Sequence, residues 1–533
     1  MHVRLRLDAR RPRRWHALLA AELSDGFGCA VDFDLRPSPD PWTGSADLLF
    51  RLEAAIHRLP DAHMAAPARP SDLARWPGIG PARPDIVVDL CGDVPKTAAP
   101  RVWTLSYDGV PGERGLLAAL LDDRPPIAAL AEGDRVLEVG RIGTEVRGVV
   151  RTAFEDGLSR STTLIAAAVA KSRMPGTAAP PPWDIPPRAP SPRLGLGDVA
   201  GRAGRAGAGA LVRRLYRLGF NGPHWRVGWR RLDGPDVASL GHHPAGGWQS
   251  LPDDGSRFYA DPFPIVHDGT CTLFVEDYVH AKAKGVISAV RFGPDGPLGT
   301  PVPVLEEPHH LSYPFVFARD GAVWMVPESC ANGTVDLYRA TAFPGGWVKE
   351  ATLLSGVTAS DATLFERDGR WWMFATLRHA AAAAPLGRGC FSDALHLWSA
   401  PGFRGPWTPH AANPVLIDIA AARPAGRVVE RDGRLIRPVQ DCSAGYGAAL
   451  ALARIDRLDD EGFGQTVVAR LAPGPSWPGS RLHTLNAAGG FEFIDGSARA
   501  LRFAPLAARL RRGAGAPPRT DAPALARDPA AVR

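Results

Sequence analysis

Residues 361–377, DATLFERDGRWWMFATL, contain the pattern that decides the fold of this chain. Two apolar runs flank the Asp368-Gly369 pair, and an Asp-Gly pair between such runs is a strong signal for a two-residue β-hairpin turn. The pattern recurs at Asp268, Asp320, Asp368, Asp432 and Asp495, with spacings of 52, 48, 64 and 63 residues. A period of about 40–65 residues with several strands per unit predicts a β-propeller, and five repeats predict five blades.

The repeats also predict which residues share one end of the propeller. If each inner strand begins at one mouth of the central channel, its Asp-Gly turn lies at the opposite end, and the next strand returns to the first mouth. The residues seven positions before each turn aspartate and eight positions after it lie at the level of that mouth. Together with adjacent residues, they give the following polar side chains there: Asp261, Glu276, Asp277, Tyr313, Glu328, Asp361, Gln440 and Asp441. Arg378, His379 and His483 lie close to the same level, and the five turns are expected on the other face.

Opposed carboxylates over a water-filled channel suit chemistry on glycosidic bonds. One protonated carboxylic acid can donate its proton to the leaving oxygen, while an ionised carboxylate activates water or attacks the anomeric carbon. Neighbouring negative charges help to keep one carboxyl group protonated near neutral pH. Asp261, Asp361 and Glu328 are therefore the catalytic candidates. Alternatively, Asp261 before Pro262 and Asp361 after Ser360 shape turns, and Glu328 is a solvent-facing loop residue.

Polar residues around these carboxylates are candidates for substrate binding. Gln440, Asp441 and Arg437 either hydrogen-bond sugar hydroxyls or an anionic group, or form a buried network between blades. His483 either orients a carboxylate or holds a channel water or ion, and a core histidine with satisfied hydrogen bonds explains it equally well. The substrate-binding candidates are Tyr313, Glu276, Asp277, Arg378, His379, Arg437, Gln440, Asp441 and His483. We expect no required cofactor and no metal ligands. A structural divalent cation near the channel stays open as an alternative, although no feature of the sequence supports it.

Residues 1–172 have a different pattern. Val3–Leu7 alternates as a strand does, and residues 15–23 and 45–59 carry apolar residues at helical spacing. Pro84–Leu90 is a continuous apolar run of the kind found in buried parallel strands. This alternation predicts an α/β, Rossmann-like domain, in which the lack of a GxGxxG motif gives no support for dinucleotide binding. The expected fold is multidomain, with this unit joined to an all-β five-bladed propeller.

Shifts in composition mark the boundaries between units. Residues 173–197 are proline-rich and predict a semi-rigid linker, and residues 504–533 predict a disordered tail rich in Ala, Pro and Arg. Between them we expect a basic helix over 198–221 and the propeller over 222–503. The helix interleaves leucines with arginines, so it either packs against its own domain or contacts an anionic membrane surface.

Composition excludes several classes of function. Of the 62 basic residues only five are lysine, a bias typical of GC-rich coding, and residues 504–533 contribute +4 of the net charge of +6. We find no basic face with interleaved aromatics, which argues against a nucleic-acid partner. No apolar stretch reaches the roughly 18 residues that span a bilayer, and the first residues lack the apolar core of a signal peptide. Six singly scattered cysteines predict free thiols and a cytoplasmic protein.

The propeller region resembles a known family at five short motifs. They are FYADPF (258–263), SYPFVF (312–317), PES (327–329), SDATLF (360–365) and RPVQDCS (437–443). These motifs look like the N-terminal propeller domain of glucosamine inositolphosphorylceramide transferases, which is similar in fold to the arabinanase, invertase and levansucrase glycosidases. The resemblance implies Asp261 as base or nucleophile and Asp361 as a positioning or pKa-tuning carboxylate. Those glycosidases carry their general acid, a glutamate, at the start of the fourth blade, where this chain has RPAG (423–426), so Glu328 would have to substitute.

The N-terminal unit resembles a diverged formyltransferase. Residues 84–90, WTLSY (103–107) and Arg114-Gly115 look like a strand and the substrate loop of that fold. The Asn-x-His-x-Ser segment that supplies the catalytic polar groups of those enzymes is not matched, because Trp103 and Leu105 stand where polar side chains are needed. The resemblance therefore implies a retained scaffold without formyl transfer.

These observations predict a glycan-active protein of surface-polysaccharide or glycolipid metabolism, whose propeller mouth acts on glycosidic bonds by hydrolysis or transfer. The alternative is a non-catalytic glycan-binding or scaffold module that serves a partner glycosyltransferase. The expected partner is an oligosaccharide or a glycolipid, with peripheral membrane contact left open and no transmembrane segment expected.

Overall fold

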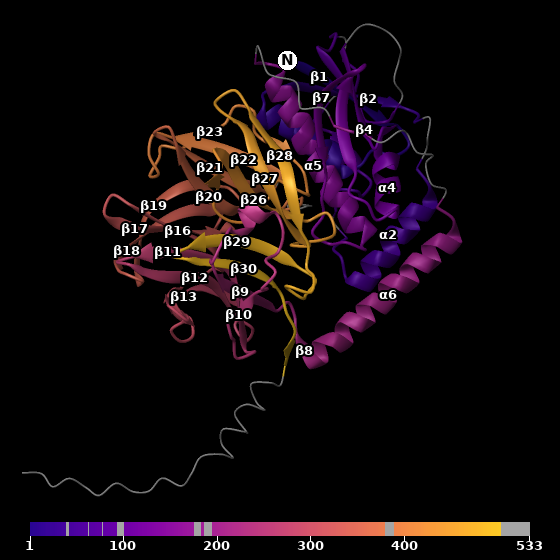
Figure 1. Cartoon of the computed structure of the whole chain (residues 1–533). Coiled ribbons are helices and arrows are strands. Elements are labelled where there is room, and N and C mark those ends of the chain that lie inside the picture. The colour runs from indigo at the N-terminus through magenta and orange to yellow at the C-terminus, as the bar shows by residue number, and fades with distance from the viewer. Residues whose placement is uncertain are drawn as a thin grey trace, which may run out of the picture.

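The computed structural model describes residues 1–38, 42–61, 63–76, 78–80, 82–92, 101–174, 183–185, 194–378 and 389–502. Most of the predicted linker and the whole predicted tail lie outside these residues. Two units pack side by side, an N-terminal sheet with helices and a β-propeller (Figure 1). Within the described ranges, no helix combines the length and apolar character needed to cross a membrane. All six cysteines have free thiols.

The C-terminal unit confirms the predicted five-bladed propeller. Four blades are built from consecutive antiparallel strands. They are β11 (Arg257–His267), β12 (Thr270–Val279), β13 (Lys284–Gly293), β14 (Gly296–Pro297) and β15 (Val302–Leu305); β16 (Ser312–Arg319), β17 (Ala322–Ser329), β18 (Thr334–Ala342) and β19 (Gly345–Ser355); β20 (Ala359–Arg367), β21 (Arg370–Leu377), β22 (Ala394–Ala400), β23 (Thr408–Pro409) and β24 (Leu416–Ile417); and β25 (Val429–Arg431), β26 (Arg434–Asp441), β27 (Ala449–Leu458) and β28 (Phe463–Leu471).

The fifth blade closes the ring with strands from both ends of the propeller. Its order is β10-β9-β30-β29, so β9 (Trp225–Arg231) and β10 (Gln249–Ser250) pair with β29 (Leu482–Ala488) and β30 (Phe491–Ser497). Seven residue pairs join β9 to β30. The two ends of the propeller are therefore held by backbone hydrogen bonds, which leaves no open strand edge at the closure.

Four of the five predicted Asp-Gly turns are formed. At Asp268, Asp320, Asp368 and Asp432 the φ angle lies between 47° and 52°, and the following glycines have φ between 70° and 73°. Positive φ at both central residues is the requirement of a type I′ hairpin. The fifth prediction is wrong, because Asp495 lies inside β30 and the turn is formed by Gly489 and Gly490, with φ of 61° and 76°. Two glycines meet the same backbone requirement, so the sequence held two candidate turns six residues apart.

The N-terminal unit is a mixed sheet with the order β2-β1-β3-β4-β6-β7. Strands β1 to β4 are parallel, whereas β6 and β7 are antiparallel, so a Rossmann-like classification and the formyltransferase resemblance stay predictions. Trp103 and Leu105 are buried in the core, which fits a scaffold role. The elements are β1 (His2–Asp8), α1 (Arg14–Ala21), β2 (Ala30–Arg36), α2 (Gly44–His57), α3 (Pro70–Leu73), β3 (Ile86–Asp89), β4 (Arg101–Tyr107), β5 (Val110–Pro111), α4 (Glu113–Leu121), β6 (Ile127–Glu132), β7 (Arg135–Arg141) and α5 (Val150–Lys171).

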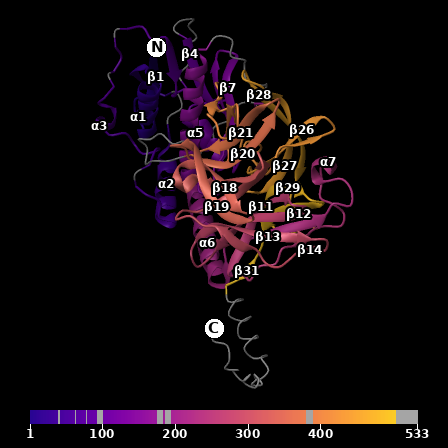
Figure 2. The same ribbon diagram turned by 90° about the vertical axis from the view of Figure 1, so that its left-hand side faces the viewer.

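The helix α6 (Leu196–Gly219) connects the two units and packs against α2 at the edge of the molecule (Figures 1 and 2). A short pair of strands, β8 (Phe220–Asn221) and β31 (Ala500–Leu501), follows it, and the one-turn helix α7 (Val237–Leu240) precedes β10. The predicted basic helix is therefore formed, although only part of its surface packs against its own domain.

The two units share a closely packed interface. α5 lies between the N-terminal sheet and the propeller in both views (Figures 1 and 2). Two glycines allow the backbones to approach, because a Cβ atom on Gly140 would lie 2.4 Å from Cβ of Ile417, and one on Gly143 would lie 2.2 Å from Cδ1 of Ile419. Ala394 and Ile417 belong to the hydrophobic core of the N-terminal unit. The interface is thus a continuous core rather than a wet contact.

A buried ion pair lies at the centre of this interface. Nη2 of Arg160, on α5, lies 2.7 Å from Oδ1 of Asp393, and these side chains are 1% and 0% exposed. The second carboxylate oxygen accepts a hydrogen bond of 2.9 Å from the backbone N–H of Gly143. Arg160 also donates to the carbonyl oxygens of Leu377 and Cys390 at 3.1 Å. Each charge is therefore compensated only while the units are docked.

We predict that Arg160→Met lowers the free energy of unfolding by about 3–5 kcal/mol, because it leaves the carboxylate of Asp393 buried without its partner. Adding Asp393→Leu should restore much of the loss. The exposed pair of Arg457 with Asp459 gives a control, since Arg457→Met should leave the denaturant midpoint unchanged. The measurement is equilibrium unfolding in urea, and a midpoint for Arg160→Met equal to that of the control would contradict the interface.

Candidate active site at the propeller mouth

Four of the five inner strands are interrupted at the same place near one end of the channel, and the short β25 of the fourth blade is the exception. The pairing with the next strand shifts after Ala260, Ser312 and Ser360, and again after Leu482 in the fifth blade. The first bulged residues are Asp261, Tyr313 and Asp361, with φ of 49°, 44° and 57°. Asp tolerates the left-handed region better than most residues, whereas a tyrosine there is strained. In the fifth blade, the first residue after the shift is His483.

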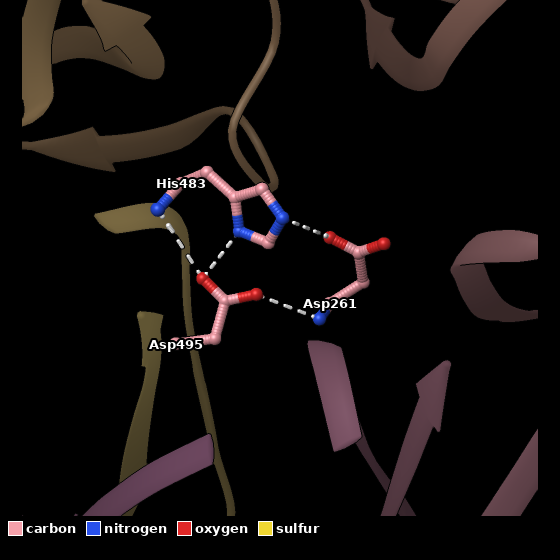
Figure 3. A group of neighbouring side chains, drawn as sticks. All are labelled: Asp261, His483 and Asp495. Atoms are coloured by element: carbon pink, nitrogen blue, oxygen red, sulfur yellow. Dashed lines mark hydrogen bonds and ion pairs between the residues drawn. The ribbon is translucent and has the colours of Figure 1, made fainter. Parts of the chain in front are cut away.

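Asp261, His483 and Asp495 form one compact group (Figure 3). Oδ1 of Asp495 lies 2.6 Å from Nδ1 of His483, and its Oδ2 accepts a hydrogen bond of 2.8 Å from the backbone N–H of Asp261. Nε2 of His483 lies 3.6 Å from Oδ1 of Asp261. The indole of Trp225 stacks on the imidazole with 4.0 Å between ring centroids. The histidine is thus held between two carboxylates and against an aromatic face.

These contacts favour a charged histidine. Burial alone would lower the pKa of His483, but the carboxylates of Asp495 and Asp261 outweigh it and raise that pKa to about 9. Stacking on Trp225 also stabilises a cation. The three residues carry the donor atoms of a metal site, with all ligand atoms within 4.8 Å of one another. The same three groups can therefore hold either a proton on the imidazole, as an ion pair, or a metal ion in its place.

Asp361 is fully engaged by residues of the fourth blade. Nε of Arg423 donates to its Oδ2 at 2.6 Å, and Nη2 of the same guanidinium donates to Oδ1 at 3.3 Å. The amide of Gln440 donates to Oδ2 at 2.8 Å. All three side chains are buried. Asp361 is therefore a carboxylate whose charge is neutralised and whose position is fixed.

Glu328 joins this group from the second strand of the second blade. Its Oε2 accepts a hydrogen bond of 3.1 Å from the backbone N–H of Asp361 and lies 3.8 Å from Nη2 of Arg423. Its Oε1 lies 3.3 Å from the thiol of Cys330. The side chain is 10% exposed, so it keeps access to the channel mouth.

The carboxyl groups of the mouth influence one another. Burial is the main cause that raises the pKa of Asp261 to about 7, and the charges of Glu276 and Asp361 add to it while His483 opposes it. Burial likewise raises the pKa of Asp361 to about 7, with Arg423 opposing and Glu328 adding to the shift. Clustered groups with raised pKa values are typical of catalytic sites, although structural networks produce them too.

Two further residues at this mouth were not found from the sequence. Nε2 of His310 lies 3.3 Å from Oε1 of Glu276, which places that carboxylate at the rim. The ring of Tyr446 covers the guanidinium of Arg423 at 4.9 Å and meets the edge of His483 at 5.5 Å. Both lie in loops between strands, where no repeat spacing marks them. Asp495 was also missed, because its place was assigned to a turn on the opposite face.

Several predicted site residues have partners within the blades. The hydroxyl of Tyr313 accepts a hydrogen bond of 2.8 Å from the N–H of Gly426, and its ring packs against Phe263. Asp277 and Asp441 bind arginines of their own blades, Arg257 and Arg470.

Arg437 is fully buried and donates to Gln465 and to the carbonyl oxygens of Ala421 and Ala422. The predicted alternative of a buried network therefore describes it. Arg378 lies beside the interface with the N-terminal unit, where Nε donates to the carbonyl oxygen of Gly389 at 2.8 Å. His379 lies outside the described residues.

The N-terminal unit reaches this site through a short chain of hydrogen bonds. Oε1 of Glu145 accepts a hydrogen bond of 2.9 Å from the hydroxyl of Ser392, which lies 3.4 Å from Nη1 of Arg423. Glu145 also accepts from the backbone N–H of Phe391. The arginine that neutralises Asp361 is thus positioned in part by the N-terminal unit.

The raised pKa of His483 predicts a pH dependence of stability. The ion pairs of His483 stabilise the folded protein fully below the pKa of an unfolded histidine, about 6.5. This contribution to the free energy of unfolding, about 3 kcal/mol, is lost as the pH rises towards 9. His483→Gln should remove this decline, whereas His267→Gln, at the half-buried end of β11, should keep it. Urea unfolding at several pH values measures both. An unchanged decline in His483→Gln would show that the histidine is neutral in the folded protein.

Comparison with known proteins agrees with the predicted resemblance of the propeller. Residues 249–489 match the family model described as glucosamine inositolphosphorylceramide transferase 1, N-terminal. The protein of that name from Oryza sativa subsp. japonica is 34% identical over 242 residues, which cover 44% of this chain and 31% of the relative. The one from Arabidopsis thaliana is 33% identical over 236 residues, covering 43% and 30%. The chain therefore spans about a third of the length of the curated relatives it matches.

Solved structures are similar at a lower level. A family-43 β-xylosidase/α-arabinofuranosidase from a compost metagenome has a TM-score of 0.34 at 12% identity, covering 47% of this chain and 92% of that one. A levansucrase from Gluconacetobacter diazotrophicus has a TM-score of 0.33 at 12% identity, covering 46% and 76%. The sequence match, which runs from β10 to the end of β29, makes the propeller similar to the N-terminal region of glucosamine inositolphosphorylceramide transferases.

Proposed function

We propose that the propeller mouth binds a glycan and acts on a glycosidic bond, by hydrolysis or by transfer. One observation carries the proposal: carboxyl groups from the first three blades, those of Asp261, Glu328 and Asp361, meet at one mouth. A pair of such groups in different protonation states is what glycoside chemistry requires. A glycan or glycolipid substrate also fits the names of the plant relatives.

The contacts suggest a distinct role for each carboxyl group. Asp261 is oriented by the hydroxyl of Thr484 at 3.0 Å and by the backbone N–H of Tyr313 at 3.1 Å, so it would act as base or nucleophile. Glu328, which keeps some exposure, would serve the leaving oxygen as general acid. Asp361 has both oxygens bound by other side chains, so it would position rather than react.

A second candidate function is glycan binding without catalysis, in the service of a partner glycosyltransferase. It is favoured by Arg423, which stands where the similar glycosidases are expected to carry their general acid and which neutralises Asp361 instead. A site with this charge balance can hold sugar hydroxyls through fixed donors and acceptors.

We predict that Asp261→Asn abolishes turnover of a responsive glycan and changes its affinity by less than about tenfold, or ~1.4 kcal/mol. The amide keeps the size and one hydrogen-bonding oxygen but lacks the charge of a base or nucleophile. Glu328→Gln should also lose turnover, and an activated aryl leaving group should partly rescue it because such a group departs without protonation. Turnover and binding are measured separately, by product analysis and calorimetry on a glycan panel.

Asp268→Asn is the matched control. It makes the same chemical change in the hairpin turn that follows the same strand, where φ is also positive at 47°, and should leave turnover unchanged. Wild-type protein that binds a glycan but gives neither hydrolysis nor transfer across the panel would replace the catalytic proposal with the binding one.

We also infer that α6 can bring the protein to an anionic membrane, where a glycolipid would be met. Leu211, Leu215 and Leu218 are 57%, 57% and 62% exposed and lie on one side of the helix. Arg214 and Arg217 lie among them, and the sequence from 199 to 232 contains eight arginines and no acidic residue. An exposed apolar stripe flanked by arginines is typical of helices that lie in a membrane interface.

Replacing Leu211 and Leu215 with serine should weaken binding to vesicles of phosphatidylcholine and phosphatidylglycerol by about tenfold for each leucine. Binding should also fall with added salt, since the arginines contribute through screened charges. Leu298→Ser, at a leucine that is 67% exposed on the propeller, is the control. Vesicle flotation measures the effect, and a dimer in solution that the two serines dissociate would identify a second copy as the occupant instead.

A further inference from the structure

A cavity of about 430 Å³ lies where α6, the N-terminal unit and the fourth blade meet. Its walls come from α2, from the turn after α4, from the start of α5 and from α6, and Ile419, Cys442 and Ser443 of the propeller close it. A second hollow of about 300 Å³ continues along α6 and shares Arg202 and Arg205 with it. The cavity is a separate feature from the carboxylates of the propeller mouth.

Arginines dominate the charge of this cavity. Five line it, and they come from three separate segments: Arg124, Arg147, Arg202, Arg205 and Arg213. The acidic residues along the wall are Glu53, Asp122 and Asp123. Arg124 lies 3.6 Å from Asp122, and Arg147 lies 3.5 Å from Asp123, so the two aspartates are already paired with arginines outside α6.

The third acidic residue is also occupied. The two oxygens of Glu53 accept hydrogen bonds from the backbone N–H groups of Val150 and Arg151, at 3.0 Å and 2.7 Å. These are the first N–H groups of α5, so Glu53 caps that helix. Its negative charge also interacts favourably with the positive end of the helix dipole. Its carboxylate is therefore committed to α5 and does not form an ion pair with the arginines of α6.

Within the part of the chain that the structure describes, the α6 arginines that line the cavity form no ion pair, although the charge of Arg202 acts on Glu53. Arg202 donates to the carbonyl oxygen of Leu121, a neutral acceptor. Among the described residues, the guanidinium groups of Arg205 and Arg213 form neither a hydrogen bond nor an ion pair. Cations that outnumber the anions around a hollow repel one another and attract a negatively charged ligand.

A histidine at the cavity wall supports the same conclusion. Nε2 of His57 is buried and has no hydrogen-bond partner in the described structure. Burial lowers the pKa of His57, and the charge of Arg213 lowers it further. An anion between the two side chains would accept a hydrogen bond from the imidazole and relieve the repulsion.

We propose that this cavity binds a ligand through a phosphate or diphosphate group, held by Arg205 and Arg213 of α6 with His57 of α2. Guanidinium groups match phosphate oxygens with paired hydrogen bonds, which a cluster of arginines from several segments can supply from different sides. The volume leaves room for more than the phosphate itself. The same chemistry is carried by soluble phosphorylated compounds and by lipid headgroups, and the proposal does not depend on catalysis at the propeller mouth.

The first test uses inorganic pyrophosphate as the probe and the full chain at low ionic strength. Calorimetry should show saturable binding with one site, and Arg205→Gln and Arg213→Gln should each weaken it by at least tenfold. Arg214→Gln removes the same charge from the same helix outside the cavity, so it should leave the affinity within about twofold. All three arginines are exposed, and the melting temperatures without ligand should agree.

A second readout separates a site from general charge attraction. The pKa of His57, followed by NMR of its imidazole, should rise when pyrophosphate saturates the protein, because a bound anion favours the charged imidazole. Glycerol phosphate and a short-chain phosphatidic acid kept below its critical micelle concentration then compete against pyrophosphate, and the better competitor identifies a soluble or a lipid ligand. A monomeric lipid is used because vesicles would also bind the exposed face of α6. Absence of saturable binding, equal weakening by Arg213→Gln and Arg214→Gln, or an unmoved pKa of His57 would each overturn the proposal.

Discussion

The mouth of the propeller depends on carboxylates that accept hydrogen bonds from bulged backbone N–H groups of the neighbouring blade. Asp495 accepts from Asp261, Asp261 accepts from Tyr313, and Glu328 accepts from Asp361. A left-handed conformation costs a non-glycine residue about 1–2 kcal/mol, and charge-assisted hydrogen bonds offset that cost. The same contacts join blade to blade, so the geometry of the site and the closure of the ring have one physical origin.

Charge compensation explains why so many acidic groups tolerate one another here. Arg423 is shared between Asp361 and Glu328, and His483 is shared between Asp261 and Asp495. Each cation is itself covered by an aromatic ring, which excludes water and strengthens the pairing. The site is thus two ion-paired halves, and the half that contains Arg423 is further connected to the N-terminal unit.

The sequence predicted the parts of this arrangement that repeat. The constant offset from Asp268 and Asp368 placed Asp261 and Asp361 at equal depth, because strand residues advance by a fixed rise. The same offset could not place Asp495 in the site, because Gly489-Gly490 satisfies the same turn geometry as an Asp-Gly pair. Tyr446 and the partners of Arg160 depend on how segments far apart in the chain pack, and no local pattern encodes such contacts.

The bare backbones of Gly140 and Gly143 have a consequence for the history of the chain. A side chain at either position would collide with Ile417 or Ile419, so the glycines and the isoleucines constrain each other across two units. Selection therefore acts on them as a linked set. In a propeller that has a different neighbour, or none, the isoleucines are free to be replaced by polar residues. The residues at positions 417 and 419 therefore indicate whether a related propeller evolved with this N-terminal unit attached.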